Sequence, residues 1–182
     1  MALRFYSAPL VRRLVWNYWL PVMENKLDLD IGAELIDNNT SDDYYTPPFI
    51  FEQLGLQFDL DVAAPVGGVP WIPARNHYSI LDDGLSKEWF GLVWCNPPYS
   101  DVTPWAKRMM THGNGIALVQ TAKSAWFNEM WGKADGALIL MPNLKFVRGN
   151  GQSAPIFMPA MLFAFGDVTS SALNKSGLGH VR

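Results

Sequence analysis

The sequence has one cysteine, no long uninterrupted apolar run and no excess of positive charge. The only cysteine, Cys95, excludes an intramolecular disulfide and a cysteine-based zinc site. Polar residues interrupt the apolar patches of residues 1–22 before they reach the length of a secretory signal core or a membrane span, which indicates a cytoplasmic protein. The three histidines lack metal-ligand spacing, so we expect no metal.

The net charge of −3 is unevenly distributed along the chain. Residues 1–103 contain 6 Lys and Arg against 14 Asp and Glu, whereas residues 104–148 contain 6 against 2. Basic side chains supply the phosphate contacts that dominate affinity for nucleic acid. The candidates for such contacts are Lys107, Arg108, Lys123, Lys145 and Arg148. Each of these five side chains also fits an ordinary solvated surface.

A chain of 182 residues with 49% apolar side chains has the size and composition of one domain with a substantial core. Residues 1–43 show the least pattern, with a short helix expected at 14–22 and a loop at 37–43. We therefore expect an N-terminal extension without an assigned role over 1–43, the main domain over 44–168 and a flexible tail over 169–182.

Strand and helix patterns alternate from residue 44 onward. A helix is expected after Thr46, whose side chain suits an N-cap before Pro47 and Pro48, and Gly55 should end it. An α/β fold with a trimmed, mostly parallel sheet and a terminal antiparallel hairpin fits this order. Apolar runs predict strands at 58–64, 92–95, 115–120 and 136–141, helices at 104–111 and 125–133, and a final antiparallel pair at 145–148 and 160–165.

The motif Asn96-Pro97-Pro98-Tyr99 follows the apolar strand expected at 92–95. Ligands of open α/β sheets bind beyond the carboxyl ends of the strands, so the motif lies where a reactive loop is expected. It also fits an ordinary proline-rich turn, because short motifs recur by chance.

These residue types suit methylation of an amino group on an aromatic ring, whose nitrogen lone pair is delocalised. The side-chain oxygen of Asn96 and the carbonyl oxygen of Pro97 can each accept one N–H of that group and direct its lone pair at an activated methyl carrier. Pro97 and Pro98 hold these acceptors in place before the substrate arrives. A base inside a duplex must flip out to reach the loop, and the ring of Tyr99 is suited to stack on it.

Five ordered blocks, spanning about residues 44–166, resemble the phage-type DNA N6-adenine methyltransferases. The resemblance implies a Rossmann-like fold that uses S-adenosylmethionine, double-stranded DNA as partner, and a phage or prophage origin in a bacterial host. The blocks are Tyr45-Thr46-Pro47, Phe58 to Ala64, Asp82 to Leu85 with Trp89, Trp94 to Tyr99 with Trp105, and Phe127 followed by Lys145-Phe146, Arg148-Gly149 and Ala154-Pro155.

The resemblance also implies roles for individual residues. It makes the segment from Asn96 to Tyr99 the catalytic loop, and it assigns cofactor contacts to one helix start, one strand end and the segment around Asp82 and Asp83. The positions matching the cofactor segments are Thr46 and Pro47 at the methionine end, Asp61 and Ala63 beneath it, and Asp82 or Asp83 near the ribose or adenine.

Two features depart from the family pattern. Asp61 is followed by Val-Ala-Ala-Pro rather than by a Gly-x-Gly turn, and the interval from Asp61 to Asn96 is short for the usual strand–helix units. The second feature is the reason to expect a trimmed sheet. Asp59 and Asp61 share one strand face, so either is a candidate functional carboxylate.

The leading hypothesis is a site-specific methyltransferase that moves a methyl group from S-adenosylmethionine to N6 of adenine in DNA. The same acceptor pair serves another planar amine, such as cytosine N4 or a glutamine side-chain amide. The missing Gly-x-Gly turn and the acidic first half of the chain also suit a nucleic-acid-binding module without catalysis.

Overall fold

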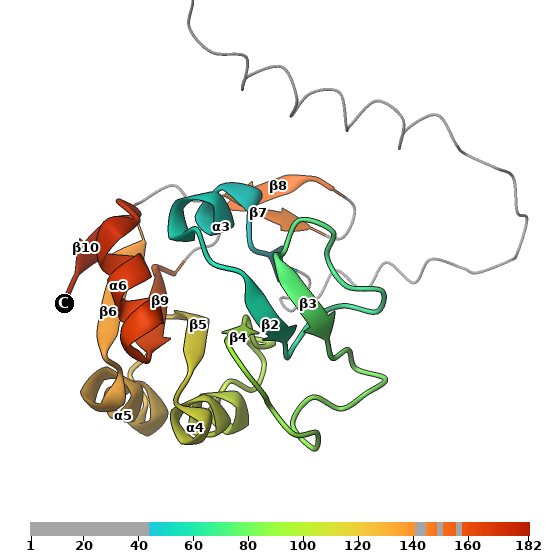
Figure 1. Ribbon diagram of the computed structural model, residues 1–182, viewed down its shortest axis with the longest axis horizontal. Coiled ribbons are helices and arrows are strands. Elements are labelled where there is room, and N and C mark those ends of the chain that lie inside the picture. Colours follow the sequence, from blue (N-terminus) through green and yellow to red (C-terminus); the bar gives the residue numbers. More distant parts are fainter. Residues whose placement is uncertain (1–43, 141–144, 149–150, 156–157) are drawn as a thin grey trace, which may run out of the picture. The chain divides into compact units, whose positions relative to one another are not determined.

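The computed structural model describes residues 44–140, 145–148, 151–155 and 158–182 (Figure 1). The helix expected at 14–22, the loop expected at 37–43 and the N-terminal extension as a whole lie outside the described residues.

The main feature is a seven-stranded sheet in the order β10-β6-β9-β5-β4-β2-β3. Strands β3, β2, β4 and β5 are parallel, whereas β9 runs antiparallel to β5 and β6, and β10 antiparallel to β6. The predicted α/β class with a mostly parallel sheet is confirmed. The strands are β2 (Phe58–Asp61), β3 (Ala74–His77), β4 (Val93–Cys95), β5 (Gly115–Gln120), β6 (Gly136–Leu140), β9 (Ala160–Phe165) and β10 (Gly179–Val181).

Helices cover both faces of this sheet, so the central strands are buried on both sides. Along β5, Ile116 and Leu118 pack into one core and Ala117 and Val119 into the other, as the two-residue period of a strand requires. The first core lies under α3 and α6, and the second under α4 and α5, which run side by side in Figure 1. The helices are α3 (Pro48–Leu54), α4 (Thr103–His112), α5 (Ala125–Lys133) and α6 (Asp167–Lys175).

A second, small antiparallel sheet has the order β1-β7-β8, with β1 at Tyr44–Tyr45, β7 at Lys145–Arg148 and β8 at Ser153–Pro155. The predicted pairing of 145–148 with 160–165 is therefore wrong. Residues 145–148 pair with β1 and β8, whereas 160–165 form β9 between β5 and β6. All six side chains of β9 are buried, which suits a central strand rather than the edge of a hairpin.

Helix α3 begins and ends close to its predicted bounds. Gly55 ends it in the left-handed conformation, with φ of 61°, and donates its N–H to the carbonyl of Phe51. The expected N-cap differs, because Pro47 occupies that position and no side chain caps the helix. The hydroxyl of Thr46 is instead buried without a hydrogen-bond partner among the described residues.

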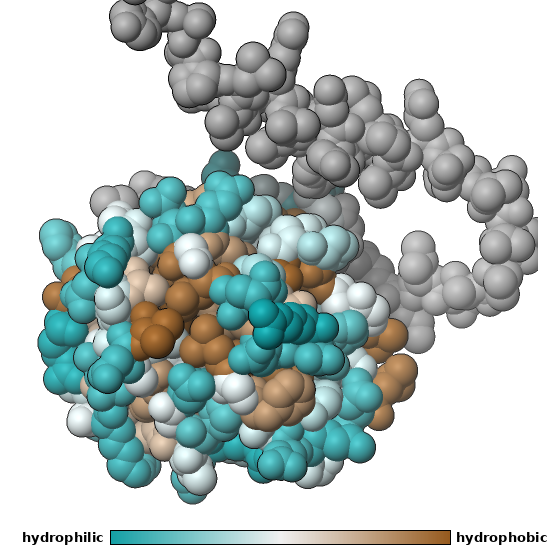
Figure 2. All heavy atoms as spheres, in the orientation of Figure 1, coloured by the Kyte–Doolittle hydropathy of each residue, from teal (hydrophilic) through white to brown (hydrophobic). Residues whose placement is uncertain are grey.

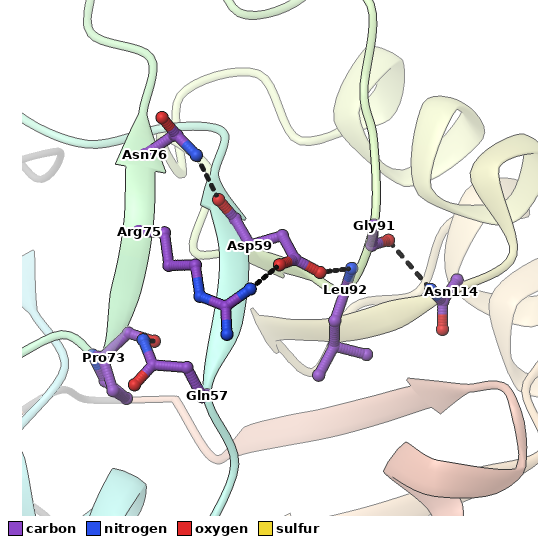
Figure 3. A network of polar contacts seen from close by, with 8 residues as sticks. All are labelled: Gln57, Asp59, Pro73, Arg75, Asn76, Gly91, Leu92 and Asn114. Atoms are coloured by element: carbon purple, nitrogen blue, oxygen red, sulfur yellow. Dashed lines mark hydrogen bonds and ion pairs between the residues drawn. The ribbon is translucent and has the colours of Figure 1, made fainter.

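The connection from β2 to β4 is trimmed, as expected: it contains the single strand β3 and no helix. Asp59 holds this region together (Figure 3). One carboxylate oxygen of Asp59 accepts a hydrogen bond from Arg75 on β3 at 3.0 Å, and the other accepts the backbone N–H of Leu92 at 2.8 Å. Gly91 packs so closely on this carboxylate that a Cβ would lie 2.3 Å from its oxygen. Asp59 therefore has a structural role.

The end of the chain belongs to the packed fold rather than to the expected tail at 169–182. Helix α6 buries Leu173, and β10 pairs with β6. Leu178 is buried in the core beneath α3 and α6, and at Gly179 a Cβ would lie 2.0 Å from the carbonyl oxygen of Ile139. Gly179 thus reflects close strand packing, whereas Gly177 adopts a positive φ of 67°.

The viewed face carries mostly hydrophilic side chains, with apolar ones gathered near its middle (Figure 2). None of the helices in the described residues combines the length and apolar content needed to cross a membrane.

Candidate active site

A cavity of about 560 Å³ opens where parallel strands β2 and β4 end. Its volume falls in the range of small-molecule sites, and its position is that of ligand sites in open α/β sheets. Its walls come from β1, the turn after β2, the loop after β3, the loop after β4 and the first turn of α4. The lining residues are Tyr44, Tyr45, Val62, Ala63, Ala64, Pro65, Val66, Ser79, Ile80, Asp83, Gly84, Asn96, Pro98 and Trp105.

Asn96 lines this cavity and carries an unused side-chain acceptor. Its side-chain nitrogen donates to the backbone carbonyl of Tyr44 at 2.9 Å. Since a carbonyl can only accept, this bond determines which end of the amide faces Tyr44 and leaves the oxygen on the other side. That oxygen is buried and has no hydrogen-bond partner among the described residues. A buried acceptor without a partner costs free energy, which a ligand N–H would recover.

The rest of the predicted catalytic loop surrounds this amide. Pro98 lines the cavity, whereas Pro97 is buried. Tyr99 is half-buried but is not among the cavity-lining residues. Its hydroxyl is buried without a described partner, and this burial raises the pKa of Tyr99 above its ordinary value.

Asp61 ends β2 next to the cavity wall. Its side chain is buried, with the residue only 4% exposed, and one carboxylate oxygen accepts the backbone N–H of Ala63 at 3.2 Å. Burial away from water raises the pKa of Asp61 to about 7, while the hydrogen bond from Ala63 opposes this rise. The wall beside it consists of Val62, Ala63 and Ala64, which stand where many methyltransferases have a Gly-x-Gly turn.

Gly84, in the loop after β3, packs closely on the turn after β2. A Cβ at this position would lie 2.2 Å from the carbonyl oxygen of Val62. The carbonyl of Gly84 also accepts the indole N–H of the buried Trp89 at 2.7 Å. The loop after β3 is thus held directly against the turn after β2.

The two adjacent aspartates of this loop have different surroundings. Asp82 accepts the backbone N–H and the hydroxyl of Ser79 at 2.9 and 2.8 Å, and these hydrogen bonds hold its pKa below the ordinary value. Asp83 lines the cavity and adopts a positive φ of 55°. Of the two predicted contacts, Asp83 is the one that the fold brings to the cavity.

Thr46 and Pro47 lie behind the cavity wall. Both are buried, and neither is among the lining residues; their neighbours Tyr44 and Tyr45 are. The carbonyl of Thr46 accepts the indole N–H of Trp71 at 2.8 Å, which ties this segment to the loop after β2.

The five basic candidates divide into two groups. Lys107, Lys123 and Lys145 are exposed. The guanidinium of Arg108 donates to the carbonyl of Lys87 and lies 5.4 Å from the centre of the Trp89 ring, whereas Arg148 contacts Tyr44. In Figure 1, α4 and β7 lie at opposite edges of the described part, so these residues do not form one continuous patch.

Sequence reasoning assigned a role to four of the lining residues, Ala63, Asp83, Asn96 and Pro98. It missed the other ten, which are Tyr44, Tyr45, Val62, Ala64, Pro65, Val66, Ser79, Ile80, Gly84 and Trp105. Ile80, which lines the cavity, and the adjacent Leu81 are 86% and 79% exposed, the highest values among the large apolar residues described. The signal available in the sequence was this pair of aliphatic residues between Ser79 and Asp82. Exposed apolar loop residues often mark a binding site, so the pair could have indicated a contact with a ligand or partner. In the described part of the chain, no three His, Cys, Asp or Glu side chains come together as a metal site.

The mostly parallel sheet and the cavity at the ends of β2 and β4 are consistent with a Rossmann-like methyltransferase fold. A model of the DNA N-6-adenine-methyltransferase (Dam) family matches residues 34–171, so the chain belongs to this family. The comparisons with curated proteins and with solved structures gave no match.

Proposed function

We propose that this protein transfers a methyl group from S-adenosylmethionine to N6 of adenine at specific sites in DNA. The observation that carries the proposal is the side-chain oxygen of Asn96, a buried acceptor without a described partner at the cavity. Family membership supports adenine over cytosine N4 or a glutamine amide as the acceptor.

The residues around the cavity fit S-adenosylmethionine, which carries an apolar ring, hydroxyl groups and a positively charged end. Apolar wall residues such as Val62 and Ile80 suit the ring, and Asp83 suits hydroxyl groups. Burial deprives the ionised carboxylate of Asp61 of solvation by water, and a cation bound nearby would stabilise that ionised form. The buried hydroxyl of Thr46 and the adjacent Pro47 belong to the segment proposed to hold the methionine end.

In the proposed reaction, the bound cofactor supplies an electrophilic methyl group. The oxygens of Asn96 and Pro97 accept the two N–H groups of the adenine amine and draw its lone pair out of the ring plane. Pro97 and Pro98 keep both acceptors fixed, so little reorganisation is needed during the reaction. The ring of Tyr99 stacks on the flipped base.

DNA contacts are proposed for the exposed Lys107, Lys123 and Lys145, and for Arg108, which follows Lys107 on α4. The resemblance to phage-type enzymes supports action on DNA in the cytoplasm of a bacterial host.

The test is methylation of a defined plasmid with isotopically labelled S-adenosylmethionine. The DNA is digested to nucleosides, and the methylated bases are identified and mapped. Labelled N6-methyladenine at a recurring sequence is the expected product. Label in N4-methylcytosine alone would refute the proposal, and so would DNA binding without any cofactor binding in calorimetry.

A further inference from the structure

Asn96 is held by a part of the fold that is distant in sequence, the small sheet β1-β7-β8. We propose that Tyr44 and Arg148 form a positioning pair that keeps the Asn96 amide oriented with its oxygen free for substrate. This inference rests on the proposed function, because it explains how that oxygen is kept available.

The first step concerns the backbone. The carbonyl of Tyr44 accepts the Asn96 side-chain N–H at 2.9 Å, across 52 residues of sequence. Tyr44 lies opposite Arg148 in the antiparallel pairing of β1 with β7. Strand β1 has only two residues, and among the described strands it pairs with β7 alone. The position of the Tyr44 carbonyl therefore depends on this pairing.

The second step concerns the side chains. The guanidinium of Arg148 donates to the Tyr44 hydroxyl at 3.1 Å, and its carbon lies 5.4 Å from the centre of the Tyr44 ring. Phe146, fully buried two residues earlier on β7, packs edge-on against the same ring at 6.5 Å. Two residues of β7 therefore fix the Tyr44 side chain, while the Tyr44 backbone carbonyl accepts the hydrogen bond from Asn96.

This arrangement assigns Arg148 a role different from a phosphate contact. A phosphate-binding arginine presents its guanidinium to solvent, whereas Arg148 is half-buried and directs it at Tyr44. Lys145, on the same strand, is exposed and provides a matched comparison.

The variants are Arg148→Met, which removes the guanidinium, and Tyr44→Phe, which removes only the hydroxyl contact. The comparison variant is Lys145→Met, which removes a proposed phosphate contact on the same strand and should raise KM for DNA with kcat unchanged. We expect Arg148→Met to lower kcat about ten-fold and Tyr44→Phe about three-fold, with KM for cofactor and DNA unchanged. Circular dichroism must show that each variant folds, and Tyr44→Phe provides the milder variant if Arg148→Met does not. A raised KM for DNA and a shallower salt dependence in Arg148→Met, with kcat unchanged, would instead identify a phosphate contact and overturn the inference.

A double-mutant cycle separates positioning from general destabilisation. In an Asn96→Ala background, Arg148→Met should cause no further loss of kcat, because the amide it positions is gone. An undiminished ten-fold loss in that background would contradict the proposal.

A third readout does not depend on the reaction. Side-chain amide protons of Asn96, assigned by NMR from their loss in Asn96→Ala, should exchange slowly in wild type and Lys145→Met and faster in Arg148→Met. Slow exchange retained in Arg148→Met would refute the positioning pair even if the enzyme methylates adenine. Conversely, the expected exchange pattern in a protein that transfers no methyl group would support the pair and refute only the proposed function.

Discussion

The carboxyl ends of β2 and β4 are neighbours in one sheet and border the same cavity, yet they present opposite chemistry. At the end of β4, Asn96 offers a neutral acceptor whose orientation is set by a hydrogen bond to Tyr44. At the end of β2, Asp61 is a buried carboxylate whose described hydrogen bond comes from its own turn, at Ala63. The Asn96 amide is thus oriented by a residue of another sheet. The Asp61 carboxylate, in contrast, is destabilised in its charged form by burial.

This difference separates two tasks. A fixed neutral acceptor stabilises a changing charge distribution during reaction, whereas a desolvated carboxylate rewards the arrival of a cation. Damage at β4 should therefore affect turnover, and damage at β2 should affect cofactor affinity. Substitutions at the two strand ends test this division of tasks.

Asn96→Ala should have the largest effect. Removing one preorganised hydrogen-bonding group from a reaction centre lowers kcat by roughly 100- to 1,000-fold, and we expect about the upper figure for this residue. Cofactor affinity, measured by calorimetry, should stay within about two-fold. The control is Asn128→Ala, an exposed position on α5. Wild-type turnover in Asn96→Ala would remove this residue from the mechanism.

Asp61→Ala should weaken cofactor binding about 30-fold, the cost of losing a charged hydrogen-bonding partner. At saturating cofactor, kcat should stay close to that of wild type. Calorimetric titration with S-adenosylmethionine measures the change, and Glu52→Gln on the exposed side of α3 is the control. An unchanged affinity would mean that the end of β2 does not serve the cofactor.

The stability of the ligand-free protein should fall as pH rises between about 5 and 8. The pKa of Asp61 is raised from 3.8 to about 7, so at pH 5 the unfolded state has already lost the proton that the folded state keeps until the pH approaches 7. Linkage then lowers the free energy of unfolding by about 2 kcal/mol over the window.

Denaturant melts of wild type and Asp61→Asn, which cannot ionise, test this dependence. The variant should lack the part of the slope that Asp61 supplies, whereas Glu52→Gln keeps Asp61 and should keep the slope. Identical slopes in wild type and Asp61→Asn would contradict the pKa attributed to burial.

Tyr99 should show the smallest effect. Loss of one stacking ring in Tyr99→Ala should raise KM for DNA about ten-fold. In Tyr99→Phe, KM for DNA should stay within about two-fold of wild type. The hydroxyl has no described hydrogen-bond partner, so its burial costs free energy and its removal loses no described contact. Steady-state kinetics with the mapped plasmid site distinguishes them. An equal rise in KM for DNA in both variants would mean that the hydroxyl, rather than the ring face, contacts the base.

Local patterns predicted most of the central elements. The apolar runs and their breakers indicated α3, α4, α5 and the five strands β2, β4, β5, β6 and β7 to within a few residues of their observed bounds. Failures occurred where short segments depend on partners: β3 is a polar edge strand, and β10 contains a glycine that reads as a loop signal. The strand at 160–165 was found, but its neighbours were not.

For the candidate site, the amino-acid sequence alone determined that a stiff Asn-Pro-Pro-Tyr loop follows a buried strand, because propensity and spacing are properties of adjacent residues. Only the tertiary structure decided that the Tyr44 carbonyl orients the Asn96 amide, that Asp83 rather than Asp82 reaches the cavity, and that Arg148 contacts an aromatic ring. Such contacts join residues far apart in the chain, and their geometry arises when the two sheets and the loops between their strands pack together.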